Sequence, residues 1–176
     1  MRSEGRKENR FMFEKFGEFD SAEELNAAAE GLLKEGDTSS LMELAKENGI
    51  DEEDAADYRD GYATSLATVT MAAFGRLKVL EKQEIEKIKN PIEQMAMRVI
   101  ITFLKGMCTD ETMAAAVMQK GKRISEIFKA MKNEAEKHKD GNTGISCGTD
   151  RELCEIIRAY YTQSDSRFKE KIKSLY

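Results

Sequence analysis

Residues 90–107 read NPIEQMAMRVIITFLKGM, and this stretch decides the fold class. Asn90 can cap a helix, and Pro91 suits its first turn, because the N–H that proline lacks would be unpaired there anyway. The pattern predicts a long amphipathic helix. Its apolar positions recur at helical spacing and form one broad face: Ile92, Met95, Ala96, Val99, Ile100, Phe103, Leu104 and Met107.

A second long helix is expected directly before this stretch, over residues 64–90. Two long helices joined by a short turn predict an antiparallel hairpin, or a pair that extends into a partner chain. Because their apolar faces are extensive, a homodimer through these helices is a further expectation. The inner face of the first helix is marked by apolar residues at helical spacing: Leu66, Val69, Ala73, Leu77, Leu80, Ile85 and Ile88.

The composition of the 176-residue chain favours helix throughout. A single proline is present, and Ala, Glu, Lys, Leu and Met, which have high helix propensity, are abundant. Clusters of β-branched residues and the dipeptides of tight hairpins are nearly absent. Apolar residues make up 40% of the chain, enough for one domain with a sizeable core or for two small ones. We therefore predict an all-α fold.

The chain is expected to have three parts. Residues 1–16 are predicted to form a flexible arm, residues 17–62 an acidic three-helix unit, and residues 63–176 a C-terminal helical domain built on the two long helices. Near the start of the chain, phenylalanines predict a lid that packs on the helical body, with an exposed partner patch as the alternative: Phe11, Phe13, Phe16 and Phe19.

Local signals place the ends of the helices. Ser21 and Glu24 form a capping box, and Asp51 is expected to cap the third helix. Gly36 and Gly49 suit the left-handed conformation that ends a helix. Later helices are expected to begin near residues 109–110, 123, 149–150 and 164–165.

Residues 51–60 read DEEDAADYRD, and six of these ten residues are acidic. The run lies where a helix-turn-helix motif places its DNA-reading helix, but DNA phosphates would repel it. Three interpretations stay open: a helix pair without a recognition role, an acidic face that docks in a basic protein groove, or a DNA-binding unit that uses other basic residues. The inward packing positions of the motif are occupied by Leu44, Ala45, Ala55 and Tyr58.

Charge is divided unevenly along the chain. Residues 1–60 carry 18 acidic and 8 basic side chains, whereas residues 61–176 carry 15 acidic and 20 basic ones. The split predicts an interaction face, with attraction between the two halves as the alternative. A solvated face or a weak nucleic-acid contact is expected where basic residues cluster: Lys82, Lys87 and Lys89; Lys120, Lys122 and Arg123; and Lys169, Lys171 and Lys173.

The sequence contains no constellation for catalysis. His138 is the only histidine, and Cys108, Cys147 and Cys154 lack metal-ligand spacing. Residues 141–144 are not followed by the Lys-Ser/Thr of a phosphate loop. No segment has 18 apolar residues or the form of a signal peptide, and three irregularly spaced cysteines suit a reducing cytosol. We expect a cytoplasmic protein that is not an enzyme, binds no cofactor or metal and does not enter a membrane.

Five segments resemble proteins of mobile elements. Residues 13–26 (FEKFGEFDSAEELN), 35–37 (EGD) and 44–51 (LAKENGID) resemble the N-terminal part of small proteins from gut Firmicutes, some of which are anti-CRISPR proteins that inhibit Cas9-type nucleases. Residues 103–121 (FLKGMCTDETMAAAVMQKG) and 156–161 (IIRAYY) are similar to the PcfK-like family of conjugative elements, which is also tied to Cas9 inhibition.

The resemblance implies a stoichiometric inhibitor that binds a guide-loaded type II CRISPR nuclease and blocks the binding or cleavage of target DNA. Such a nuclease holds nucleic acid in positively charged channels, which an acidic helical protein can occupy. A DNA-binding regulator or conjugation accessory protein of a mobile element is the alternative. The residues expected to face the nuclease are the outer acidic residues of the third helix: Asp51, Glu52, Glu53, Asp54, Asp57 and Asp60.

Overall fold

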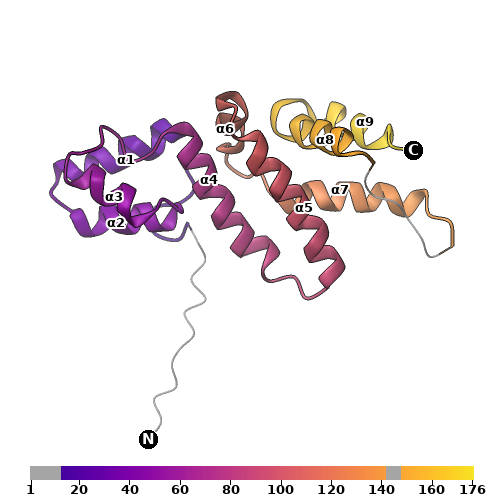
Figure 1. The fold of residues 1–176 in the computed structure, drawn as a ribbon, viewed down its shortest axis with the longest axis horizontal. Helices are drawn as coiled ribbons and strands as arrows, with labels where there is room; N and C mark the ends of the chain where they lie inside the picture. The colour runs from indigo at the N-terminus through magenta and orange to yellow at the C-terminus, as the bar shows by residue number, and fades with distance from the viewer. Residues whose placement is uncertain (1–12, 142–147) are drawn as a thin grey trace, which may run out of the picture.

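The computed structural model describes residues 13–141 and 148–176, and these form an all-α protein (Figure 1). Within these two ranges there is no β-strand, which confirms the predicted fold class. In chain order the helices are α1 (Ala22–Lys34), α2 (Thr38–Glu47), α3 (Glu52–Arg59), α4 (Val69–Leu80), the π-helical segment η1 (Glu81–Ile85), α5 (Pro91–Met107), α6 (Glu111–Val117), α7 (Ile124–Lys137), α8 (Asp150–Thr162) and α9 (Asp165–Lys173).

Capping residues account for most of the helix ends. At the start of seven helices a side chain accepts a hydrogen bond from a backbone N–H group of the first turn: Ser21, Asp37, Thr68, Asn90, Asp110, Thr149 and Ser164. Glycines in the left-handed conformation follow α1, α2, α3 and α6: Gly36, Gly49, Gly61 and Gly121. The predicted capping box at Ser21 is shifted, because the Glu24 carboxylate accepts from the N–H of Asp20 instead of that of Ser21.

The helix predicted over residues 64–90 begins later than expected, at Val69, because residue 67 is held outside it. The side-chain amide of Asn26 in α1 donates to the carbonyl of Ala67 at 2.8 Å and accepts from its N–H at 3.0 Å. Thr68 then caps α4. At its other end α4 continues into η1, and α5 returns from the joint formed by residues 86–90 (Figure 1).

Two clusters of buried apolar residues fill the molecule, and α4 contributes to both. The N-terminal core joins α1, α2 and α3 to the segment before α4, and the C-terminal core lies among α4 to α9. Ala72 belongs to the N-terminal core, while Ala73 and Leu77 belong to the C-terminal one. The boundary expected between residues 62 and 63 therefore falls before a helix that both cores share.

The segment before α1 is attached to the helical body. Phe19 is buried in the N-terminal core and Phe16 packs against it, which confirms the lid expectation for these two residues. The N–H of Lys15 donates to the Glu47 carboxylate at 3.0 Å. Phe11, with the rest of residues 1–12, lies outside the described residues.

The buried face of α5 agrees only in part with the predicted one, which also included the buried Leu104. Met97, Ile101 and Leu104 are at most 2% exposed and face α7, α8 and η1. The predicted inner residues Ile92, Met95 and Val99 are instead 74%, 63% and 43% exposed. This helix is apolar around more than half of its circumference, so its periodicity alone cannot select which stripe the neighbouring helices cover.

The turn between α2 and α3 packs directly on the backbone of α4. A Cβ atom added to Gly49 would lie 2.4 Å from the carbonyl oxygen of Gly75, and one added to Gly75 would lie 2.3 Å from the carbonyl oxygen of Asn48. Two glycines therefore allow the close approach that places α3 beside α4.

Substitution of Gly49 by alanine should disrupt this contact. Gly49 has a φ of +69° as well as no space for a side chain, so Gly49→Ala should lower the free energy of unfolding by about 3 kcal/mol or more. Gly36→Ala is the matched control, because its φ is +74° but no described atom lies within 4 Å of the added Cβ. The control should cost only about 1 kcal/mol in urea unfolding. Equal losses in the free energy of unfolding for the two variants would contradict the close contact between Gly49 and Gly75.

Candidate partner-binding surface

The helix pair α2 and α3 packs as the sequence predicts. Leu44 and Ala45 of α2 and Ala55 and Tyr58 of α3 are all buried in the N-terminal core. These four residues use the inner faces of the two helices. The acidic residues of α3 are consequently left on its outer side.

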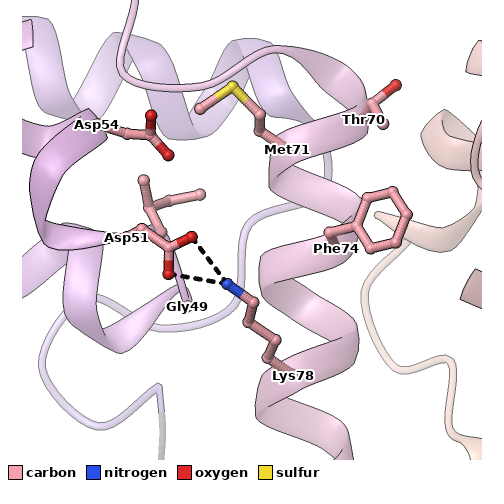
Figure 2. Close-up of a pocket in the computed structure, with 8 residues that line it drawn as sticks. Gly49, Asp51, Asp54, Thr70, Met71, Phe74 and Lys78 are labelled. Atoms are coloured by element: carbon pink, nitrogen blue, oxygen red, sulfur yellow. Dashed lines mark hydrogen bonds and ion pairs between the residues drawn. The ribbon is translucent and has the colours of Figure 1, made fainter.

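Two of the six predicted site residues are paired within the protein itself, and a third is half-buried. Asp51 makes no capping bond to α3 and instead accepts two hydrogen bonds from the ammonium of Lys78, at 2.8 and 3.1 Å (Figure 2). Asp51 thus occupies the N-cap position of α3, as predicted, but its carboxylate makes no capping bond. Asp60 pairs with the neighbouring Arg59 at 2.7 Å, and this pairing lowers the pKa of Asp60. Asp54 is half-buried and faces a cavity.

The other three predicted residues, Glu52, Glu53 and Asp57, point into solvent. All three are exposed, and none forms an ion pair with any described residue. Glu52 and Glu53 lie in the first turn of α3, where the helix dipole stabilises negative charge by about 0.5 kcal/mol each. We call these three residues the α3 acidic surface. Their charges are available to a cation from outside the chain.

A cavity of about 130 Å³ lies beside this surface, between α3 and α4. Ile50, Met71 and Phe74 give it apolar walls. The carboxylates of Asp51 and Asp54 lie on one side of it, and Lys78 reaches across from α4 (Figure 2). Apolar walls with carboxylates at the rim suit the stem and the charged end of a lysine or arginine side chain.

Part of the charge division between the two halves is satisfied inside the molecule. Basic residues of the second half pair with acidic residues of the first half: Lys78 with Asp51, Lys120 with Glu24, and Arg76 and Arg123 with Glu18. The cluster at residues 120–123 is therefore structural, as is Lys122, whose ammonium donates to the carbonyl of Tyr160 at 2.7 Å. Attraction between the halves, the alternative interpretation, explains these pairs.

One buried residue that the sequence reading did not single out organises the neighbourhood. Arg76 of α4 is 3% exposed, and its guanidinium donates to the carbonyls of Phe19, Met118 and Gln119 at 2.7, 2.6 and 2.9 Å. Glu18 supplies the nearest carboxylate, at 3.4 Å. A lone arginine in the apolar stretch of residues 71–80 was the available signal, because an unpaired charge there could not be buried.

Glu18 is the charged partner of two arginines. Burial on its own would raise the pKa of Glu18, but the hydrogen bond from Arg123 and the charges of Arg76 and Arg123 lower it below its ordinary value. Arg123 donates to both carboxylate oxygens, at 2.8 and 3.1 Å. Glu18 therefore stabilises the fold in its ionised form.

The histidine and the cysteines, which are the candidates for catalysis or metal binding, do not form a common site in the described residues. His138 follows α7, with its ring stacked on Tyr176 and one nitrogen 3.3 Å from a carboxylate oxygen of Glu134. Burial raises the pKa of the Cys108 thiol to about 11, and Cys147 lies outside the described residues. Across residues 13–141 and 148–176 no cluster of His, Cys, Asp and Glu side chains could hold a metal ion. The helices in these ranges include none long and apolar enough to span a bilayer.

Comparison of the chain with protein-family models, with curated proteins and with solved structures gives no match. The description of the surface therefore depends on the residues of this chain alone.

Removal of one acidic charge should lower the stability of the protein more when the carboxylate is structural than when it belongs to the α3 acidic surface. Glu18→Gln should lower the free energy of unfolding at pH 7 by about 2 kcal/mol or more, because Arg76 then loses its nearest carboxylate in a buried setting. Glu52→Gln should change it by less than about 1 kcal/mol, since only an exposed charge at the helix start is lost. Equal losses in urea unfolding would contradict this assignment.

The effect of Glu18→Gln should also depend on pH. A carboxyl group whose pKa is lowered by folding stabilises the protein above its unfolded pKa, and the contribution is lost as the pH falls through the lower, folded value. The difference in stability between the wild type and Glu18→Gln should be largest above about pH 4.5 and should shrink on acidification. A difference that grows as the pH falls would contradict the role of the ionised group.

Proposed function

We propose that the protein is a stoichiometric inhibitor that binds a guide-loaded, Cas9-type RNA-guided nuclease through the α3 acidic surface. The observation that carries the proposal is the exposure of Glu52, Glu53 and Asp57 without an ion pair to any described residue. The kind of partner comes from the resemblance of residues 13–26, 35–37 and 44–51 to small proteins of gut Firmicutes, some of which are anti-CRISPR proteins.

The proposed mode of action is occupation of a nucleic-acid channel. A nuclease of this type holds its nucleic acid in positively charged channels and reads a short DNA motif with arginine side chains. Carboxylates on a rigid helix can pair with such arginines in place of phosphate groups. Inhibition by occupation requires no catalytic residue in this protein.

The cavity beside the surface gives the proposed contact a place for one side chain. A lysine or arginine of the nuclease would lay its stem against Met71 and Phe74 and bring its charge to Asp54. Lys78 already places an ammonium on Asp51 at the same rim (Figure 2). The exposed pair between Lys78 and Asp51 contributes little to stability, so a partner could displace it at small cost.

Charge reversal of the α3 acidic surface should abolish inhibition. In a DNA-cleavage assay with guide-loaded nuclease, the Glu52→Lys, Glu53→Lys, Asp57→Lys triple variant should need at least ~100-fold more protein than the wild type for half inhibition. Reversal of three exposed acidic residues on other elements, Glu86, Asp150 and Glu170, changes the net charge equally and should have little effect.

Two results would contradict different parts of the proposal. Unchanged inhibition by the triple variant, with its helicity retained, would show that another surface binds the nuclease. A wild-type protein that fails to inhibit Cas9-type nucleases at all would overturn the proposed function.

High salt should lower the rate of association with the nuclease, because salt screens the attraction between the charges. A rate that does not depend on the salt concentration would contradict the steering by charge.

A DNA-binding regulator or accessory protein of a mobile element is the second candidate, and one observation favours it. Lys82 in η1 and Lys87 and Lys89 in the joint that follows it are exposed, and this basic site lies apart in sequence from α3. A gel shift of the isolated protein on duplex DNA distinguishes the two functions. Tight, sequence-dependent binding without a nuclease, lost on substitution of these lysines, would favour the regulator.

A further inference from the structure

The exposed side of α5 carries a regular stripe of uncharged residues. Three of them are the large apolar residues Ile92, Met95 and Val99, which belong to the most exposed large apolar residues described. The stripe continues through the exposed residues Thr102 and Gly106. Successive members are three and four residues apart in alternation, which is the spacing of a seam between two helices. The geometry is therefore suited to a helix as the covering element.

Gly106 has no role in the packing of the chain that explains it. A Cβ atom added there would meet no atom of the described residues within 4 Å. A glycine inside a helix destabilises it by about 0.5–1 kcal/mol relative to alanine. Its absent side chain leaves room for a large side chain of a covering helix beside the C-terminal end of α5.

The size of the stripe residues points to an antiparallel copy of the same helix. The large residues Ile92 and Met95 lie at the N-terminal end of α5, and the small residues Thr102 and Gly106 lie at the C-terminal end. Val99 is at the midpoint. An antiparallel second copy would set the large end of each stripe against the small end of the other, with Val99 near the two-fold axis.

Charge at the two ends of α5 favours the same direction. Lys89 is exposed just before α5, and Asp110 and Glu111 are exposed just after it. Antiparallel packing brings the lysine of each copy alongside the two acidic residues of the other, whereas parallel packing sets like charges together. Size and charge thus select the same orientation.

We infer that two copies of this protein associate through an antiparallel pairing of their α5 helices along the stripe Ile92, Met95, Val99, Thr102 and Gly106. The seam of a single helix pair is smaller than the about 1,600 Å² of a standard interface. Association is accordingly weak, with a dissociation constant in the micromolar range or above. The inference does not depend on the partner of the α3 acidic surface.

Sedimentation equilibrium of the full chain, from micromolar to near-millimolar concentration, tests the association. The average mass should rise from one chain towards two. Val99→Glu and Gly106→Leu should keep the protein monomeric, with helicity unchanged by circular dichroism. Gly31→Leu is the matched control, because Gly31 is also a helical glycine with no described atom within 4 Å of an added Cβ. This control should associate like the wild type.

Disulfide cross-linking tests the orientation. In a background with Cys147 and Cys154 replaced by serine, a mixture of Ile92→Cys and Gly106→Cys chains should oxidise mainly to the mixed dimer. Preferential cross-linking of each variant to itself would overturn the antiparallel arrangement. A wild type that stays monomeric at every concentration, or a Val99→Glu variant that still dimerises, would overturn the inference and leave the stripe to a different partner.

Discussion

The buried guanidinium of Arg76 is the interaction on which the arrangement of the helices depends. The guanidinium donates hydrogen bonds to the carbonyls of Met118 and Gln119, which directly follow α6. It also donates to the carbonyl of Phe19 in the segment before α1. A buried cation without partners would destabilise the fold by several kcal/mol, so these acceptors must stay in place. One side chain thereby joins three segments that are far apart in the sequence.

Two neighbours of Arg76 on α4 extend this constraint to the candidate surface. Gly75 receives the backbone of the α2–α3 turn, and Lys78 pairs with Asp51 at the start of α3. The close approach of Gly49 and Gly75 fixes the start of α3 against α4, and the exposed pair between Lys78 and Asp51 lies beside it and contributes little. The acidic residues of the chain therefore fall into two groups, one that neutralises the protein's own cations, such as Glu18, and one that faces solvent, such as Glu53.

The sequence was sufficient wherever structure is determined by neighbouring residues. Asn90 with Pro91, Thr149 and Gly49 place helix ends through bonds and backbone angles within one turn, and these predictions were confirmed. The delayed start of α4 was missed because it depends on Asn26, which lies 41 residues away from Ala67.

The candidate site was predictable in composition but not in detail. The acidic run and its inner residues Ala55 and Tyr58 were recognised, whereas the capture of Asp51 by Lys78 depends on how α3 meets α4. Part of the predicted inner face of α5, namely Ile92, Met95 and Val99, is exposed instead, since apolar stripes on one helix look alike until neighbours cover one of them. The partners of Arg76 could not be predicted, because they are mainly backbone carbonyls, which carry no sequence signal.

Carboxyl footprinting of the full chain, with and without guide-loaded nuclease, tests most directly whether solvent-facing acidic residues form the contact. A carbodiimide label should modify Glu52, Glu53 and Asp57 readily in the free protein and should react much less in the complex. Glu18, only 16% exposed and bound to two arginines, should be modified slowly in both states. Protection confined to other carboxylates, with these three still labelled in the complex, would contradict the account.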